Sequence, residues 1–343
     1  MTSDPDAQGQ ENRQGEPDAR RCHGVTVKGA PCRNRPLAGQ DYCLLHTPKT
    51  QGERWAEIGD EPPPPPKTVE SWKEFFQMMA RRHRGRYDVD DLGLDMEFLE
   101  QFRPLARWIY HKYWRVTVTG IENVPAEGRA LLVANHSGVL PFDGAMVIMA
   151  VQEEHPQHRM VRALVLSLFF KLPFTAPLLA KTGQVQANPV NSERLLNNDE
   201  LALVFPEGVK GIGKVWRKRY QLARFGRGGF VRVALKTRSP IIPVSIVGAE
   251  EIYPHLMNLK PIANLFGLPY VPITPFFPWL GPLGLIPLPT RWYIHFDAPI
   301  NIPDMNYRRS EEPLLMSKIS NQVRDTIQRN IHERLKSRRS VFW

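Results

Sequence analysis

The sequence predicts an α/β fold, in which helices flank a mixed central sheet, joined to a small N-terminal zinc-type module. Three observations support this prediction. Short apolar runs alternate along the chain with longer amphipathic segments. All three cysteines fall within residues 22–43. A polyproline run, EPPPPPK at 61–67, then separates the cysteine-containing block from the rest.

These features divide the 343-residue chain into four parts. Residues 1–20 are polar and charged, which predicts disorder. Residues 21–48 form the cysteine-containing module, and residues 49–70 form a proline-rich linker. Residues 71–343 form the main domain, which is long enough to bury a sizeable core.

Within the main domain, each element is predicted from its hydrophobic period. Apolar runs or alternating patterns predict strands at 115–120, 130–135, 201–205, 240–248 and 291–296. Helical spacing predicts helices at 71–85, 95–114 (capped by Asp95), 143–154, 189–200, 228–238 and 311–339. Residues 162–170 fit a strand or a helix equally well. Alternating strands and helices indicate a sheet that is covered on both faces.

The charge distribution indicates an anionic partner. The formal net charge is +10, and residues 209–238 hold ten lysines and arginines but no acidic residue. Such a surface attracts the phosphates of a lipid headgroup, a small substrate or a nucleic acid. Aromatic stacking residues are few around the basic N-terminal block, so nucleic acid is not favoured.

Three observations bear on the compartment. The N-terminus lacks an apolar signal region, and the three cysteines do not form a disulfide framework, so a cytoplasmic location is predicted. Residues 261–290 are uncharged but contain eight prolines, which excludes a membrane-spanning helix there. This aromatic segment lies either in a bilayer interface or against the core as a pocket wall. The basic helix at 311–339 either covers the core or binds anionic lipid.

Two polar loops follow predicted strands, where α/β sheets place their ligands. In NHSGVLPFD, His136 could act as a general base and Asp143 could hold its other ring nitrogen. The alternatives are a plain polar loop or a nucleophilic Ser137, although the G-x-S-x-G elbow is absent. In FPEGVKGIGK, at 205–214, glycine amides and lysines could hold a phosphate, or the loop is simply solvated.

Together, the blocks NHSGVLPFD, VFPEG and IIPVSIVG resemble, in order and approximate spacing, the lysophospholipid/glycerolipid acyltransferase family. The likeness extends from about residue 114 to 250. Three departures mark a divergent branch. Six residues separate His136 from Asp143 where the family has four. The block TGQVQANP at 182–189 lacks the family's arginine, and FPEGVKG lacks its serine or threonine.

The resemblance implies that an acyl group moves from a thioester, acyl-CoA or acyl-carrier protein, to a lipid hydroxyl, without a cofactor for catalysis. His136 would deprotonate the acceptor and Asp143 would orient His136. Amides of the 205–208 loop or of the helix start near Gly144 would stabilise the oxyanion. The expected substrate-binding residues are Glu207, Gly208, Lys210, Lys214 and Arg217. The enzyme would lie peripherally on the inner face of the membrane.

The N-terminal module carries a candidate metal site. Three thiols and an imidazole suit a tetrahedral structural Zn²⁺, and the block resembles small Cys3His motifs appended to many bacterial and phage proteins. The four candidate ligands are Cys22, Cys32, Cys43 and His46. The alternative is three reduced thiols in a disordered tail. A different function also stays open: a regulatory or nucleic-acid-binding protein that uses this module and the basic surface.

Overall fold

The computed structural model describes residues 89–137, 140, 142–171, 175–226, 228–258, 272–300, 302 and 312–342. The chain divides into two units, Met1–Lys49 and Thr50–Trp343, and every described residue belongs to the second. The predicted disordered segment, zinc-type module, linker and first helix (71–85) therefore lie outside the described residues.

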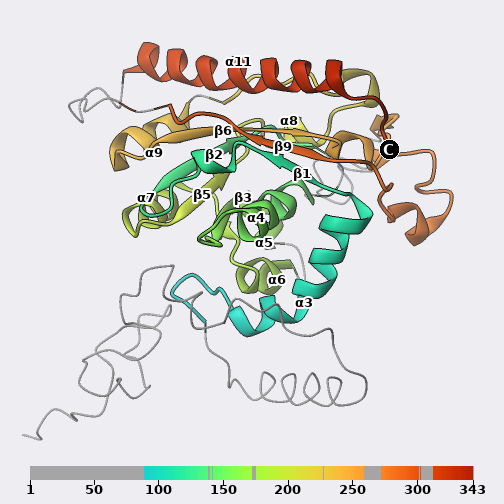
Figure 1. The fold of residues 1–343 in the computed structure, drawn as a ribbon, viewed down its shortest axis with the longest axis horizontal. Helices are drawn as coiled ribbons and strands as arrows, with labels where there is room; N and C mark the ends of the chain where they lie inside the picture. Colours follow the sequence, from blue (N-terminus) through green and yellow to red (C-terminus); the bar gives the residue numbers. More distant parts are fainter. Residues whose placement is uncertain are drawn as a thin grey trace, which may run out of the picture. The chain divides into compact units, whose positions relative to one another are not determined.

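A seven-stranded mixed sheet forms the centre of the second unit (Figure 1). Its strands are β1 (Thr117–Thr119), β2 (Ala130–Ala134), β3 (Val161–Val165), β4 (Val185–Gln186), β5 (Leu201–Val204), β6 (Ile241–Val247) and β9 (Tyr293–Phe296). Their order is β1-β9-β6-β2-β5-β3-β4. Neighbouring strands run parallel except β6 and β9, which are antiparallel. The prediction of a mixed central sheet is confirmed.

The five residues of β2 are all buried because both faces of the sheet are covered. Side chains alternate between the faces of a strand, so Leu132 enters one apolar cluster while Leu131 and Val133 enter another. The first cluster contains residues of α4 (Phe142–Glu154). The second contains residues of α7 (Pro189–Asn197) and α9 (Gly229–Thr237).

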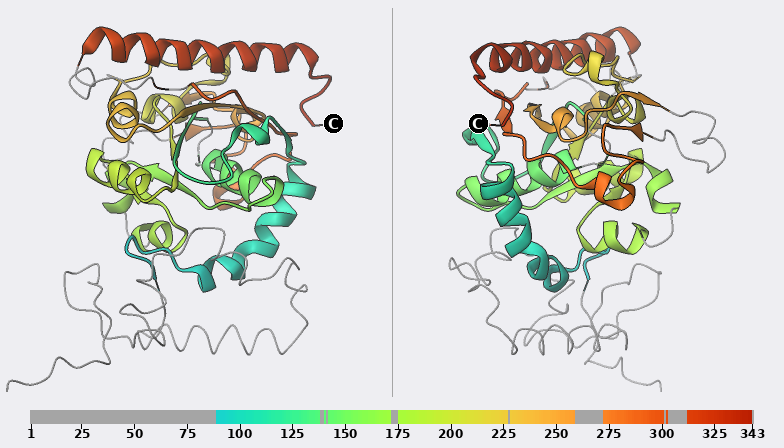
Figure 2. Two further views of the ribbon diagram at one scale, coloured as in Figure 1. Left: turned by 60° about the vertical axis from the view of Figure 1, so that its left-hand side comes forward. Right: turned by 90° about the vertical axis from the view of Figure 1, so that its right-hand side faces the viewer.

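Helix α11 (Pro313–Ser337) lies along the second face of the sheet, in dark red (Figures 1 and 2). Its buried apolar residues recur at helical spacing: Met316, Ile319, Val323, Ile327 and Ile331. The helix therefore covers the core, which is one of the two interpretations that the sequence left open.

The predicted helix at 95–114 consists of two elements. Helix α3 (Met96–Trp108) begins at Asp95, whose side chain accepts a hydrogen bond from the Phe98 amide at 2.8 Å. A π-helix, η1 (Ile109–Tyr113), then continues it. The ambiguous segment at 162–170 contains both structures, because β3 ends at Val165 and α5 (Ser167–Lys171) begins two residues later.

The sequence did not predict the shorter elements. They are α6 (Thr175–Lys181), α8 (Val209–Ile212), β4, the antiparallel pair of β7 (Met257–Asn258) and β8 (Pro272–Ile273), and the 3-10 turns η2 (Ile121–Asn123), η3 (Trp216–Lys218), η4 (Ala249–Glu251) and η5 (Gly281–Leu285). None of the helices in the described part of the chain is long and apolar enough to span a bilayer.

The topology brings the two polar loops together. β2 and β5 are parallel neighbours, with Val133 paired to Val204, so their carboxyl ends reach the same edge of the sheet. The loop that follows β2 contains His136, and the loop that follows β5 contains Glu207. This edge is where doubly wound sheets place their ligands.

Candidate active site

His136 and Asp143 form a close pair. The His136 Nδ1 atom lies 2.7 Å from the Asp143 Oδ2 atom, although six residues separate them in the sequence. Asp143 is fully buried at the first turn of α4 and also accepts hydrogen bonds from the Ser137 and Gly144 amides at 2.8 and 2.9 Å. Because an ionised carboxylate only accepts hydrogen bonds, this arrangement places the proton on His136 Nδ1 and leaves Nε2 as the basic nitrogen.

The His136 ring is held by packing, with one edge open. It stacks on Phe205 with the ring centroids 4.3 Å apart and an interplanar angle of 24°. The side chain keeps an exposed fraction of 12%, and its Nε2 atom bonds to no described residue. A partly buried, oriented imidazole with a free basic nitrogen is the arrangement that proton abstraction requires.

Neighbouring strands fix the backbone around His136. Asn135 is fully buried, and its side-chain amide exchanges two hydrogen bonds with the backbone of Ile246 on β6, at 2.7 and 3.0 Å. The His136 amide donates to Glu207 Oε1 at 3.0 Å. His136 is therefore held through Asn135 to β6 and through Glu207 to the loop that follows β5.

Glu207 belongs to a buried ionic cluster. Its Oε2 atom accepts a hydrogen bond from the Ala223 amide at 2.6 Å and lies 3.3 Å from Lys214 Nζ. Lys214 Nζ also lies 2.9 Å from Glu250 Oε1, and Glu250 Oε2 accepts a hydrogen bond from the Tyr220 amide. Burial alone would lower the pKa of Lys214, but Glu250 and Glu207 outweigh it and raise that pKa.

The location of Lys214 differs from the expectation that it binds a phosphate. Its ammonium is almost buried, and two carboxylates already neutralise it. Lys214 instead holds Glu207 in place, and Glu207 in turn holds the backbone of His136. The sequence could not reveal this contact, because Glu250 lies 36 residues further along the chain.

The other predicted binding residues surround this cluster without joining it. Gly208 is the N-cap of α8, with a φ of 55° that favours glycine, and its amide donates to the Phe205 carbonyl. Lys210 and Arg217 are exposed, and neither forms an ion pair with a carboxylate of the described residues. They remain available to a ligand phosphate, which stays a prediction.

The geometry narrows one expectation for the chemistry and does not support another. The amides of Gly144 and Gly208 already donate to Asp143 and Phe205, so oxyanion stabilisation by the other amides of the 205–208 loop stays a prediction. Ser137 is almost completely buried, and its hydroxyl makes no hydrogen bond within the described residues. A nucleophilic serine would be bonded to the histidine that activates it, so the hydrolase alternative is not supported.

Gly211 is a site residue that sequence reasoning missed. A Cβ atom there would lie 2.7 Å from the His136 Cβ atom and 3.0 Å from the His136 carbonyl oxygen. Only glycine therefore lets α8 pass this close to the histidine. The sequence FPEGVKG offered one clue to this close approach: residue 211, three positions after Gly208, is a second glycine.

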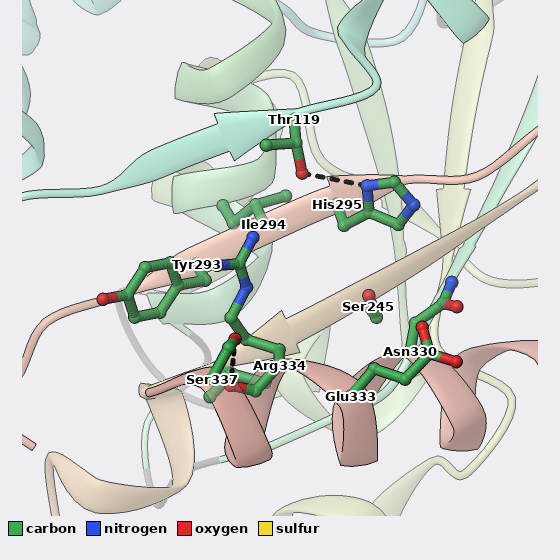
Figure 3. A pocket seen from close by; sticks show the side chains of 10 residues that line it. Thr119, Ser245, Tyr293, Ile294, His295, Asn330, Glu333, Arg334 and Ser337 are labelled. Atoms are coloured by element: carbon green, nitrogen blue, oxygen red, sulfur yellow. Dashed lines mark hydrogen bonds between the residues drawn. The ribbon is translucent and has the colours of Figure 1, made fainter. Parts of the chain in front are cut away.

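Two cavities lie near or beyond the site. A small one is lined by Gly211, Lys214, Trp216, Arg219 and Tyr253, among others. A separate groove of about 280 Å³ lies between strands β1 and β9 and helix α11, where Thr119 bonds to His295 and Arg334 projects over Tyr293 (Figure 3). It contains none of the residues of the His136 site.

Comparisons with known proteins bear on the family of the chain. An uncharacterized protein of Mycobacterium tuberculosis strain H37Rv is 48% identical over 266 residues, which cover 77% of this chain and 74% of that protein. A relative from Mycobacterium leprae is 47% identical over the same length, with coverages of 77% and 72%. The family model described as Acyltransferase matches residues 115–247, a range that contains both polar loops.

The chain belongs to the acyltransferase family. This acyltransferase is also similar to two proteins with named activities. One is phytyl ester synthase 2, chloroplastic, of Arabidopsis thaliana, which is 29% identical over 142 residues, 39% of this chain and 20% of that protein. The other is a DGAT1/2-independent enzyme synthesizing storage lipids from Bos taurus, 26% identical over 191 residues, with coverages of 56% and 53%.

Among solved structures, the acyltransferase is similar to the 1-acyl-sn-glycerophosphate (LPA) acyltransferase PlsC of Thermotoga maritima. The TM-score is 0.45 at 20% identity, and the match covers 71% of this chain and 80% of that chain. The family model and the mycobacterial relatives, not this structural likeness, confirm the resemblance predicted from the motifs at the level of the acyltransferase family.

The predicted zinc ligands Cys22, Cys32, Cys43 and His46 lie outside the described residues, so the zinc site stays a prediction. Within the part of the acyltransferase that the structure describes, no group of three or more His, Cys, Asp or Glu side chains could hold a metal ion.

Proposed function

We propose that this acyltransferase moves an acyl group from a thioester to a lipid hydroxyl, with His136 as the general base. The contact between His136 Nδ1 and Asp143 Oδ2, at 2.7 Å, carries the proposal because it leaves His136 Nε2 basic, fixed and accessible. Membership of the acyltransferase family supports the class of reaction.

In the proposed reaction, His136 Nε2 takes the proton of the acceptor hydroxyl while the oxygen attacks the thioester carbonyl. Asp143 stabilises the imidazolium that forms, because its carboxylate faces the Nδ1 proton. The tetrahedral intermediate then collapses with cleavage of the C–S bond. The departing thiolate takes the proton back from His136, so no covalent enzyme intermediate is needed.

The donor is proposed to be acyl-CoA or acyl-carrier protein, and the acceptor a lysophospholipid or a related lipid alcohol. Lys210 and Arg217 are exposed cations close in the chain to Glu207, which suits a phosphate on either substrate. The phytyl and storage-lipid activities named for the two distant relatives extend the range of acceptors worth testing. Attachment to the inner face of the membrane belongs to the same proposal.

The test is transfer of a radiolabelled acyl group from acyl-CoA, and separately from acyl-carrier protein, to a panel of lipid alcohols. We expect the wild type to transfer and His136→Ala to lose at least about a hundredfold in rate, the typical contribution of a general base. His332→Ala is the matched control, because His332 is exposed on α11.

Two results would contradict the proposal. One is a folded His136→Ala protein that transfers as fast as the control. The other is a folded wild type that transfers from neither donor to any acceptor, which would favour the binding-protein alternative.

A further inference from the structure

Exposed apolar side chains gather on one part of the surface. Trp279, Leu280, Leu283 and Ile286 are 75%, 55%, 67% and 58% exposed. Leu256 and Met257, at the start of the neighbouring strand β7, are 55% and 54% exposed. We call these six residues the apolar patch. Large side chains at such exposure in one cluster mark a binding surface rather than ordinary surface scatter.

The segment that carries most of the apolar patch is held in a defined shape. The Thr274 hydroxyl accepts hydrogen bonds from the Phe276 and Phe277 amides, at 3.2 and 2.8 Å. The Leu280 amide donates to the Phe276 carbonyl at 2.8 Å. A Cβ atom at Gly284 would lie 2.6 Å from the same carbonyl oxygen. Trp279 and Leu283 are therefore exposed by a locally ordered turn.

Three cations border the apolar patch. Arg217, Lys218 and Arg219 are exposed on and beside η3, and none of them forms an ion pair with a described carboxylate. Arg219 lies over the Trp216 ring, 4.3 Å from its centroid. Neither residues 209–238 nor residues 272–290 contain an aspartate or glutamate.

One segment joins the cations to the apolar patch. The Trp216 amide donates to the His255 carbonyl at 2.7 Å. From the other side, the Tyr253 hydroxyl donates to the Leu285 carbonyl, and the Leu288 amide donates to the Ile252 carbonyl. Residues 252–257 therefore lie between η3 and the turn that bears Trp279.

We infer that the apolar patch and these three cations form the surface by which the protein docks on an anionic lipid bilayer. Apolar and aromatic side chains would enter the interface while the cations meet lipid phosphates. A bilayer fits better than an acidic protein, because four large apolar side chains project from a turn that carries no charge. The inference rests on the proposed function, since a lipid acceptor resides in a membrane.

The docking surface adjoins the active site through the ionic cluster. His255 Nδ1 donates to the Lys214 carbonyl at 3.0 Å, and the ammonium of the same Lys214 contacts Glu207, which bonds to the His136 amide. Docking by this surface would therefore bring the base close to the lipid.

The experiment is vesicle flotation of the full chain. Vesicles are made of phosphatidylcholine alone, or of phosphatidylcholine mixed with phosphatidylglycerol. We expect binding to the mixed vesicles that weakens as salt is raised. The double variant Trp279→Ser/Leu283→Ser should lose at least about tenfold in vesicle binding. Its matched control is Val190→Ser/Leu314→Ser, since those side chains are 74% and 80% exposed on α7 and α11.

The charged part of the surface has its own pair of variants. Lys218→Glu should weaken binding to the phosphatidylglycerol vesicles severalfold, while Lys318→Glu, an exposed position on α11, should not. Circular dichroism confirms that each variant is folded.

The inference is overturned if the patch variant floats like its control. It is also overturned if sedimentation shows that the variant dissociates an oligomer while vesicle binding persists. Flotation does not depend on acyl transfer. Flotation therefore tests the docking surface, and the transfer assay tests the proposed reaction. His136→Ala should float like the wild type.

Discussion

At the scale of single residues, three neighbouring side chains set the environment of His136. Asp143 faces Nδ1, Phe205 supports one side of the ring, and the Glu207 carboxylate accepts from the backbone amide. Each fixes one degree of freedom: the tautomer, the plane of the ring and the position of the main chain. On the proposed function, we expect a base held in this way to need no reorganisation when the hydroxyl arrives.

Gly211→Ala tests how closely that position is specified. The added methyl group would meet both the His136 Cβ atom and the His136 carbonyl oxygen at 3.0 Å or less. We expect a loss of about 1–3 kcal/mol in the free energy of unfolding, as overpacking typically costs, together with slower acyl transfer. Urea unfolding and a transfer assay on the folded variant measure the two effects.

The control for this substitution is Gly226→Ala, where a Cβ atom would meet nothing within 4 Å. Gly226 lies in the same basic stretch of the chain, outside regular structure. Equal stability and equal activity of the two variants would contradict the prediction. The close approach of α8 to His136 would then not matter for stability or acyl transfer.

At the scale of elements, the ionic cluster joins the segment after α8 to η4. Lys214 contributes the only ammonium to the described cluster, and Glu207 and Glu250 contribute the carboxylates. Removing one partner of a buried ion pair costs more than the pair itself contributes, because a charge stays buried without compensation.

We therefore expect Lys214→Met to lower the free energy of unfolding by about 3–5 kcal/mol at neutral pH. The loss of stability should shrink as the pH falls. Burial raises the pKa of Glu250, and the substitution removes Lys214, which is the main influence that lowers this pKa. Glu250 in the variant therefore takes up a proton at a higher pH, which removes its uncompensated buried charge. Denaturant unfolding at several pH values measures this. The isosteric double variant Glu250→Gln/Lys214→Met should recover part of the loss, and no recovery would contradict the account.

Much of the fold could be predicted from periodicity, since the long elements have complete hydrophobic patterns. The strands at 130–135, 201–205 and 240–248 and the helix at 311–339 match β2, β5, β6 and α11 within about two residues. The two-residue strand β4 and the four-residue helix α8 each span only about one period, which is too short to leave a pattern.

The site was only partly predictable, for a related reason. The pairing of His136 with Asp143 is local in sequence and follows from chemistry and the motif. The roles of Lys214 and Asn135 depend on Glu250 and Ile246, which reach them only through the sheet topology. The sequence reveals that residues 209–238 are basic. It does not reveal that Lys214 is neutralised by a distant carboxylate such as Glu250.

At the scale of the whole molecule, we expect a buried histidine to contribute to the loss of stability in acid. His155 follows α4 and is 3% exposed. Its Nε2 atom donates to the Val124 carbonyl, and its Nδ1 atom accepts a hydrogen bond from the Gln157 amide. Only the neutral ring can make both bonds, and burial accordingly lowers the pKa of His155 from its ordinary value of 6.5.

As the pH is lowered, His155 therefore takes up a proton at a higher pH in the unfolded chain than in the folded chain. We expect stability to fall as the pH drops below about 6.5, by at most about 1.4 kcal/mol per pH unit from this one group. His155→Gln, which keeps a donor for Val124, should flatten that dependence. Melting temperatures measured across the acidic range test this, and an unchanged slope in the variant would assign the acid sensitivity elsewhere.

The attachment of the Asn135–His136 backbone to both neighbouring strands has a consequence for divergence within the family. The parts that set the proton chemistry are tied to the sheet, whereas the candidate selectivity features, the loop cations and the exposed turn around Trp279, lie outside it. On the proposed function, we therefore expect mutations in these outer features to alter substrate preference without displacing the base. Gene copies that share this core could then drift towards new acceptors while each intermediate sequence keeps the same proton chemistry.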